Sequence, residues 1–372
     1  MKNIKILFAL SIILFAFAGC NSCNQKQNED KNKIIKIGVV LPLTGDASVY
    51  GKAIKNGIEL ALSQSPIKDR LQLIYEDDKG TAKDGISATN KLAEQNVNII
   101  IGGAMSSVAA AIAPISKEKK ITLLSPTATL PSLTDAGDYF FRLWPSDNYD
   151  GEIMAKFAYD SLHLKNVAVL YVNLDYGVGI NQVFTEKYKS LGGNIVFDDG
   201  YSQGATDFKT QLQKIKTSKA EALYLPGYYK EIASILKQAK ELNLKIQILS
   251  VNSFYDPKLI EIAGGLAEGA IFTYPTFDNE GTDHTTKNFV EQYNATYKAN
   301  PDVFAAQGYD CLKVIESVIH AGNSDNEVIK TALSKIQNFN GVAGKFSFDS
   351  NGDVIKDLRL MTIKDGKFIN LK

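Results

Sequence analysis

Two short loops contain the side chains in this sequence that are best suited to binding chemistry. In each, an apolar run that predicts a buried strand leads directly into small residues and hydroxyl groups. The residues concerned are Ser106 and Ser107 after the run 99–101, and Thr127, Ala128 and Thr129 after the run 121–124. In open α/β sheets, ligands bind beyond the carboxyl ends of the strands. Hydroxyls and free backbone N–H groups at the start of a helix bind anions, so the loops indicate a site for a group such as a carboxylate.

Both loops also have a purely structural interpretation. Serine commonly caps the start of a helix, where it contributes about 1 kcal/mol. Threonines shortly before Pro131, which cannot continue a strand, are common in turns. Because two such loops follow adjacent predicted strands, the ligand-binding interpretation is favoured.

Tyrosines follow other predicted strands in both halves of the chain. Tyr50 lies after the first strand, Tyr176 lies in the segment 175–177, and Tyr228 lies in the segment 225–229. A single tyrosine is usually a half-buried packing residue. Three tyrosines at the ends of strands predict apolar walls for a ligand, with hydroxyls that orient it.

The sequence carries no motif for catalysis or metal binding. It contains no Walker loop, no G-x-S-x-G and no G-x-G-x-x-G after a strand. Ser106 and Ser107 have no histidine nearby in the sequence to act as a base. The three histidines are scattered and share no metal-ligand spacing with the three cysteines. We therefore expect a binding protein without cofactor or metal rather than an enzyme.

The first residues predict export. Two lysines precede an apolar run at 6–18, which is too short to span a bilayer because a span needs about 20 residues. The run leads to Cys20 through small residues, which is similar to a bacterial lipobox, where the signal is cut before a cysteine that receives lipid. We expect residues 1–19 to be a lipoprotein signal peptide and residues 20–33 a polar tether. An ordinary secretory signal cut nearby is the alternative.

Composition limits the remaining classes of function. The 372 residues include 41 basic and 41 acidic side chains, so charge gives no argument for binding nucleic acid or a membrane surface. Contact with a membrane is expected through the lipid on Cys20 alone. Cys23 lies in the tether, and Cys311 stands alone in a helical pattern, where a buried thiol is expected. The length predicts two domains.

Beyond the tether, predicted strands alternate with predicted helices in two successive series. The strands are expected at 34–41, 71–75, 97–101 and 121–124, and then at 167–172, 194–197, 222–225 and 246–250. The helices are expected at 51–63, 82–95, 107–119, 178–191, 207–217 and 230–243. This alternation implies βαβ units, parallel sheets and right-handed crossovers. The sequence therefore predicts an α/β fold in two lobes, with a seam near residues 141–147.

A long tail follows the second series. Its predicted elements are a strand at 270–274, helices at 283–299 and 303–321, and short strands at 344–349, 358–363 and 367–371. A tail of this length, after a finished second lobe, is expected to return to the first. The chain would then cross between the lobes several times, and the cleft between them is a favoured place for a small-molecule site.

In order and spacing, these features resemble the periplasmic binding proteins of the branched-chain amino acid type, from about Lys36 to about Gly366. The resemblance rests on segments 36–40, 44–45, 50–51, 75–78, 101–102, 106–107, 125–126, 128–129, 142, 175–177, 207–208, 227–228 and 267–269. It implies a type I periplasmic binding fold, with two Rossmann-like lobes joined by three hinge crossovers and a ligand cleft between them. Lobe 1 would comprise residues 34–145 plus 277–350, and lobe 2 residues 146–276 plus 351–372.

The resemblance also implies roles for the residues singled out above. The ligand's carboxylate would be held by Ser106, by the backbone at Thr127 and by the hydroxyl of Thr129. Tyrosines would form the side-chain pocket in one lobe and close over it from the other. The full candidate ligand-binding set is Tyr50, Ser106, Ser107, Thr127, Ala128, Thr129, Tyr176, Tyr228 and Asn252.

One position departs from the family. Where amino-acid binders of this type carry an acidic residue that pairs with the ligand's ammonium, this sequence has Asn252. An amide accepts a hydrogen bond but lacks the charge that makes such pairs strong. Asp175, Asp256 or Asp310 could supply the acid from nearby. Otherwise the ligand is a carboxylate without an amine, or an amide.

These observations predict an exported, lipid-anchored substrate-binding protein of an ABC transporter. It would capture a small carboxylate, with an amino acid of the branched-chain or a related type favoured, and deliver it to the ABC permease complex. Two alternatives stay open. One is a sensory or regulatory lipoprotein of the same fold that contacts a protein partner, and the other is a binder of an aromatic carboxylate or amide.

Overall fold

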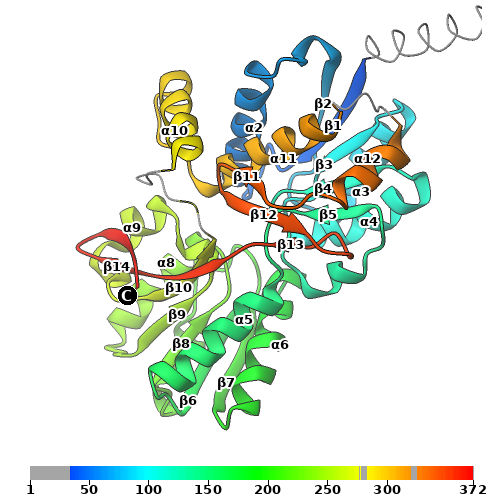
Figure 1. Ribbon diagram of the computed structural model, residues 1–372. Coiled ribbons are helices and arrows are strands. Elements are labelled where there is room, and N and C mark those ends of the chain that lie inside the picture. Colours follow the sequence, from blue (N-terminus) through cyan, green and yellow to red (C-terminus); the bar gives the residue numbers. More distant parts are fainter. Residues whose placement is uncertain (1–33, 276, 278–282, 320–324, 372) are drawn as a thin grey trace, which may run out of the picture.

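The computed structural model describes residues 34–275, 277, 283–319 and 325–371. These residues form two α/β lobes, each built on its own sheet (Figure 1). The expected signal peptide, the tether and Cys20 lie outside the described residues.

Lobe 1 contains a five-stranded parallel sheet in the order β2-β1-β3-β4-β5. Its strands are β1 Ile35–Leu41, β2 Leu71–Asp77, β3 Ile99–Gly102, β4 Thr122–Ser125 and β5 Phe140–Arg142. Its first helices are α2 Ser48–Ser63, α3 Ala82–Glu94 and α4 Ser106–Lys119. Strands β3 and β4 are buried along their whole length, because helices cover both faces of a parallel sheet.

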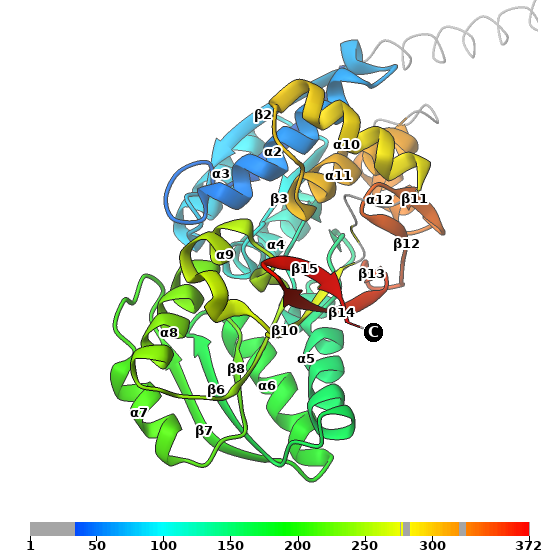
Figure 2. The same cartoon turned by 90° about the vertical axis from the view of Figure 1, so that its left-hand side faces the viewer.

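Lobe 2 contains a seven-stranded sheet in the order β15-β14-β10-β9-β8-β6-β7. Its parallel strands are β6 Asn166–Val172, β7 Asn194–Tyr201, β8 Ala222–Leu225, β9 Gln247–Ser250 and β10 Ile271–Pro275. Its helices are α5 Asp147–Lys156, α6 Asp175–Ser190, α7 Lys209–Thr217, α8 Tyr229–Glu241 and α9 Pro257–Ala263. The last two strands, β14 Leu358–Lys364 and β15 Lys367–Asn370, extend the sheet antiparallel beyond β10 (Figure 2).

The tail returns to lobe 1 before it ends in lobe 2. Its helices are α10 His284–Tyr297, α11 Val303–Ile319 and α12 Asn326–Leu333. A small antiparallel sheet follows, formed by β11 Phe339–Gly341, β12 Gly344–Phe348 and β13 Val354–Ile355. Helix α11 packs tightly against α2, since a Cβ at Gly57 would overlap the carbonyl of Ala305 and a Cβ at Gly308 would overlap that of Ile54.

Three segments therefore connect the lobes: β5 to α5, β10 to α10, and β13 to β14. The predicted α/β fold with two Rossmann-like lobes is confirmed, and all eight strands predicted for the two series are present. The predicted boundaries at residues 145, 276 and 350 stay predictions. Strand β13 pairs with β12 before the chain enters β14.

The sequence pattern predicts only a seam where α5 begins. This helix has Gly151 in its middle and a weak apolar pattern, so periodicity does not reveal it. Its start carries a local signal instead. Ser146 is the N-cap, and its hydroxyl accepts a hydrogen bond from the backbone of Asn148, with acidic residues in the first turn.

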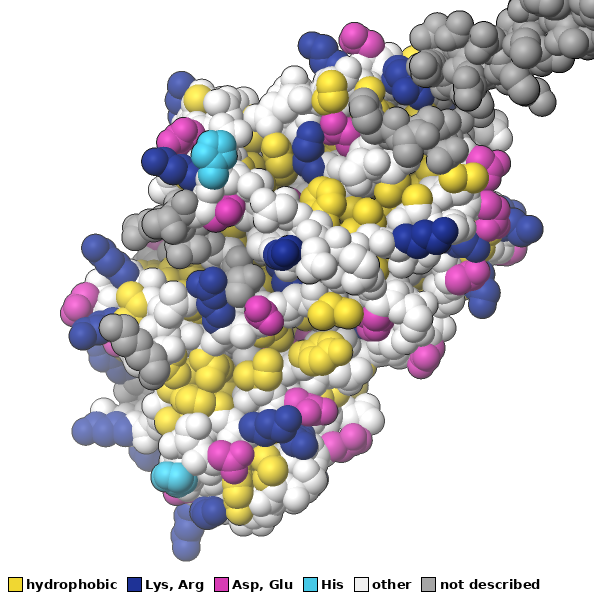
Figure 3. Space-filling model, viewed as in Figure 1, with side chains coloured by type: hydrophobic (Ala, Val, Ile, Leu, Met, Phe, Trp, Pro, Cys, Tyr) yellow, Lys and Arg dark blue, Asp and Glu magenta, His cyan; other side chains and the backbone are white. Residues whose placement is uncertain are grey.

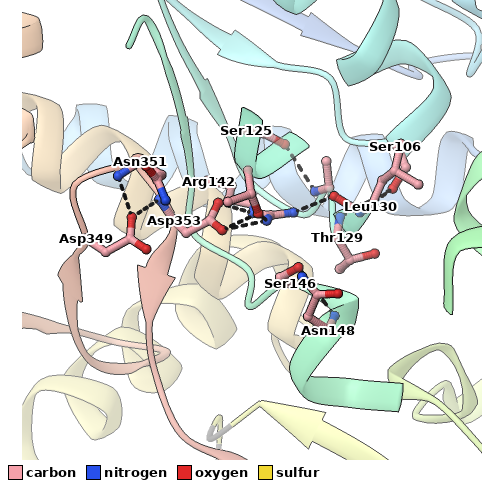
Figure 4. Close-up of polar contacts among 12 residues, drawn as sticks. Ser106, Ser125, Thr129, Leu130, Arg142, Ser146, Asn148, Asp349, Asn351 and Asp353 are labelled. Carbon is pink, nitrogen blue, oxygen red and sulfur yellow. Dashed lines mark hydrogen bonds and ion pairs between the residues drawn. The ribbon is translucent and has the colours of Figure 1, made fainter. Parts of the chain in front are cut away.

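A buried ion pair joins β5 of lobe 1 to the turn between β12 and β13. Arg142 at the end of β5 donates to the carboxylate of Asp353 over 2.6 and 2.8 Å (Figure 4). The same guanidinium donates to the carbonyl of Leu130 at 2.9 Å, in the loop that follows β4. The backbone N–H of Arg142 donates to the carbonyl of Gly352. One side chain thus fixes a candidate ligand loop against the turn that precedes β13.

Charged side chains of both signs are intermixed over the face shown in Figure 3. This distribution agrees with the balanced charge of the whole sequence. In the part of the chain that the structure describes, no helix has the length and apolar character needed to cross a bilayer.

We predict that Asp353→Asn lowers the free energy of unfolding by about 3–5 kcal/mol, because it leaves the buried guanidinium of Arg142 without its counter-ion. Urea denaturation measures this loss. The matched control is Asp138→Asn, which removes an exposed carboxylate from Lys330 and is expected to cost less than about 1 kcal/mol. Equal losses of unfolding free energy in the two variants would show that the buried ion pair stabilises the fold no more than the exposed one.

Candidate functional site

A cavity between the lobes is lined by residues from both of them. Seven of the nine predicted ligand-binding residues line it: Tyr50, Ser106, Thr127, Thr129, Tyr176, Tyr228 and Asn252. The other two do not, since Ser107 is half-buried beside the cavity-lining Ser106 and Ala128 is fully buried. Sequence reasoning missed four further lining residues: Ala104, Met105, Ser253 and Phe304. That these residues bind a ligand stays a prediction.

The topology explains why residues so distant in sequence meet here. The segments that follow β3 and β4 supply Ser106, at the start of α4, and Thr129 from lobe 1. The segments that follow β6, β8 and β9 supply Tyr176, at the start of α6, together with Tyr228 and Asn252 from lobe 2. Each segment follows the carboxyl end of a parallel strand, and the cavity lies where these ends of the two sheets meet.

Ser106 presents a hydrogen-bond donor to the cavity. It is the first residue of α4, and its Oγ accepts from the backbone N–H groups of Thr129 and Leu130, both at 3.3 Å (Figure 4). With both acceptor positions used, the hydroxyl proton is available to donate. The N-cap is Met105, with no side-chain cap, so simple capping by Ser106 is not what the structure shows. A donor beside the positive end of a helix suits a carboxylate.

Two other predicted residues hold the loops together. The Thr127 hydroxyl donates to the carbonyl of Ala104 at 2.8 Å. The N–H of Ala128 donates to Oγ of Ser125, which itself donates to the carbonyl of Gly103. These bonds connect the loop after β4 to the loop after β3, so they fix the spacing of the site.

Thr129 and Asn252 present acceptors to the cavity. Thr129 Oγ1 donates its one proton to Oδ2 of Asp147 at 2.8 Å, so this hydroxyl can only accept from a ligand. Asn252 Nδ2 lies 3.2 Å from Oδ2 of Asp150. Since an ionised carboxylate only accepts, the amide nitrogen faces Asp150 and the amide oxygen faces away from it. The resemblance assigned the Thr129 hydroxyl to a carboxylate, whereas this hydrogen-bond direction suits a donor group.

Asp147 and Asp150 are functional candidates that the sequence analysis missed. They lie three residues apart on the first turn of α5, on one face of the helix, and are 0% and 1% exposed. Burial raises the pKa of Asp150 to about 6, although the side chains of Thr273 and Asn252 favour its charged form. Burial, and then the charge of Asp150, raise the pKa of Asp147 well above its usual value. The sequence does contain a signal for this helix start: Ser146 as a possible N-cap, followed by two acids within segment 146–150.

The three acids proposed as substitutes have other surroundings. Both carboxylate oxygens of Asp310 accept backbone N–H groups, from Val342 and Ala343. Asp256 caps α9, and Asp175 is exposed. None of the three lines the cavity among the residues described. Over the same residues, no cluster of three or more His, Cys, Asp or Glu side chains is placed to hold a metal ion.

Aromatic rings form the remaining walls and bring the lobes into contact. The ring centroid of Tyr50 lies 4.7 Å from that of Phe304 in lobe 1 and 6.1 Å from that of Tyr228 in lobe 2. Tyr228 is stacked on Tyr176 at 5.6 Å. The hydroxyl of Tyr50 is buried and makes no hydrogen bond within the described residues. The walls are thus apolar, with a hydroxyl that a polar ligand could engage.

Two lobes that close on a cavity with a donor end, an acceptor end and aromatic walls define a solute-binding protein. The chain belongs to the family described as periplasmic binding protein, whose model matches residues 34–367. This membership confirms the expectation of a binding protein rather than an enzyme.

Named relatives agree with this family. The chain is 28% identical to Leu/Ile/Val-binding protein homolog 2 of Brucella abortus over 327 residues, covering 86% of this chain and 87% of that protein. It is 26% identical to the Leu/Ile/Val-binding protein of Escherichia coli K12, covering 86% and 88%.

Solved structures agree as well. A leucine-binding protein from Thermotoga maritima superimposes with a TM-score of 0.86 at 33% identity, covering 91% of this chain and 98% of that one. A branched-chain amino acid binding protein from Streptococcus pneumoniae, in complex with isoleucine, gives 0.83 at 30%, covering 90% and 98%. A Rhodopseudomonas palustris binding protein with benzoate gives 0.83 at 22%, covering 91% and 95%, which shows a shared fold.

We predict that Thr129→Ala weakens the binding of L-leucine about tenfold or more, because a hydrogen bond to a charged group contributes about 1.5–3 kcal/mol. Isothermal titration calorimetry measures the affinity, and a cooperative thermal melt shows that the variant is folded. Thr129→Ser keeps the hydroxyl next to Asp147 and is the matched control. Unchanged affinity in Thr129→Ala would remove this residue from the site.

Proposed function

We propose that this protein is the substrate-binding lipoprotein of an ABC importer. It captures a small carboxylate, with an amino acid of the branched-chain or a related type favoured, and delivers it to the permease. The observation that carries the proposal is the donor of Ser106 at the start of α4, which faces an aromatic-walled cavity between two lobes.

Closure of the lobes is the mechanism that the site supports. Tyr50 from one lobe meets Tyr228 from the other, and the exposed pair Asp46–Lys230 spans the lobes at 3.0 Å. The three connecting segments act as hinges, and the ligand favours the closed state because it contacts both lobes there. Micromolar affinity needs about 8 kcal/mol, which two polar ligand groups and an apolar side chain can supply.

Two ligand chemistries compete for this cavity. The Streptococcus pneumoniae protein was solved with isoleucine and the Rhodopseudomonas palustris protein with benzoate. Both ligands carry a carboxylate, for which Ser106 is the proposed donor, and both carry an apolar body that suits the rings of Tyr50 and Phe304. Only isoleucine carries an ammonium group. The end of the cavity that presents acceptors, at Thr129 and Asn252, therefore discriminates between the two ligands.

The N-terminal sequence supports export and anchoring. We place the signal peptide at residues 1–19, the lipid on Cys20 and a polar tether from there to residue 33. A tethered binding protein stays close to a permease in the same membrane while its lobes open and close. The alternative of a lipoprotein that senses its ligand and contacts a protein partner uses the same cavity and anchor.

We predict that a panel of L-amino acids, aromatic acids and short amides contains compounds that raise the melting temperature of protein stripped of bound ligand by unfolding and refolding. A ligand at one hundred times its Kd stabilises the folded state by about 2.7 kcal/mol. Acetate at the same concentration is the control for ionic effects. If no member of the panel stabilises the protein, the proposed function is wrong.

We also predict that Cys20→Ala moves the protein from the membrane fraction to the soluble fraction and abolishes labelling by radioactive palmitate in cells. Cys23→Ala is the matched control, because it removes a second cysteine of the tether and is expected to keep the label. Retained labelling of Cys20→Ala would exclude lipid attachment at this residue.

A further inference from the structure

We infer that buried Asp150, acting through Asn252, supplies the negative charge by which the cavity selects a ligand with an ammonium group next to its carboxylate. This inference rests on the proposed function of the same cavity and deepens it, because it names the residue that sets specificity at the acceptor end. It assigns Asp150 as a positioning residue for specificity, at a position that the resemblance does not include.

The directions of the hydrogen bonds divide the cavity into two ends. Ser106 accepts two backbone N–H groups, so it donates to the ligand. Thr129 donates its hydroxyl proton to Asp147, and Asn252 donates from its amide nitrogen to Asp150. The side-chain oxygens of Thr129 and Asn252 are therefore left to accept hydrogen bonds from the ligand. A carboxylate cannot satisfy two acceptors, whereas an ammonium carries three donors and suits both.

The charges point to the same ligand group. Asp147 and Asp150 are buried, and within the described residues neither forms an ion pair with a lysine, arginine or histidine. The nearby guanidinium of Arg142 is bound to Asp353. Oδ1 of Asp147 is buried without a hydrogen-bond partner in the described residues. Buried carboxylates without a cation are costly, and a bound ammonium would offset that cost.

The spacing of the two ends fits an α-amino acid. Ser106 Oγ lies 3.3 Å from the backbone nitrogen of Thr129, and the side chain of this same Thr129 provides an acceptor. A donor for the carboxylate and an acceptor for the ammonium therefore lie side by side. An α-amino acid carries the two groups on one carbon, so it can reach both at once.

The departure at Asn252 then has a physical explanation. The resemblance implies an acid at this position, whereas here an amide lines the cavity and Asp150 lies behind it on α5. Asp150 polarises the amide through its N–H, and the amide oxygen faces the ligand. The charge is retained but acts through one intervening group.

The test compares L-leucine with 4-methylpentanoate, the same molecule without its amine, by isothermal titration calorimetry on wild-type protein and on Asp150→Asn. We expect wild type to bind leucine about 30-fold or more tightly than 4-methylpentanoate. Asp150→Asn is expected to lose most of that preference by weakening leucine, with 4-methylpentanoate unchanged or tighter. Glu152→Gln, which removes a partly exposed carboxylate from the same helix, is the matched control and leaves both affinities unchanged.

The dependence of leucine affinity on pH distinguishes a role of Asp150 in specificity from a purely structural role. With its pKa at about 6, Asp150 must release a proton when an ammonium binds at lower pH, so leucine affinity rises from about pH 5 to about pH 7. The titratable or charged groups around Asp150 are Asp147 on its own helix, Tyr176 on α6 and Tyr224 on β8. In Asp150→Asn the part of this rise near pH 6 disappears, while any part due to Asp147 remains.

The outcomes are distinct. If 4-methylpentanoate or benzoate binds wild type as tightly as leucine, or if Asp150→Asn binds leucine normally, the inference is overturned while the proposed function stands. If neither amino acids nor carboxylates bind, the proposed function fails and takes the inference with it. The wild-type comparison needs no variant, so even if Asp150→Asn does not fold it decides whether the cavity prefers an ammonium, and equal affinities overturn the inference.

Discussion

The guanidinium of Arg142 fixes the architecture on which the site depends. It joins three parts of the chain that are far apart in sequence: the end of β5, the carbonyl of Leu130 in a ligand loop, and Asp353 before β14. Arg142 and Asp353 are both buried, and a buried ion pair is held by its geometry and hydrogen bonds rather than by charge alone. Because Arg142 binds both Leu130 and Asp353, it holds the loop that carries Thr129 against the turn before β13.

From that anchor, the site is built by hydrogen bonds whose directions follow from the chemistry of each group. Ser125 and Thr127 connect the two lobe 1 loops, which places Ser106 beside Thr129. Thr129 then contacts Asp147, the first residue of α5, on the chain's first crossing into lobe 2. The same set of bonds that holds the loops in place decides which cavity atoms donate and which accept.

The sequence predicts the parts of this arrangement that depend on local pattern. Apolar runs predict the strands, and small residues with hydroxyls predict the loops that line the cavity, since both signals lie within a few residues of each other. Asp353 lies 211 residues from Arg142, and Phe304 reaches the cavity from the returning tail, so no local pattern predicts either. The sequence predicts only a seam near Asp147 and Asp150, and the packing of α5 shows that both acids are buried.

The two buried acids place ligand specificity at the contact between the lobes. They lie at the start of α5, directly after the crossover from β5, and Asp147 is bonded to Thr129 of the opposite lobe. Asp150 is buried among residues of lobe 2, including Asn252 and Tyr224. Burial disfavours the charge of both carboxylates, and within the described residues neither has a cation as partner. On the inference drawn above, a ligand with an ammonium offsets that cost, whereas a simple carboxylate adds to it.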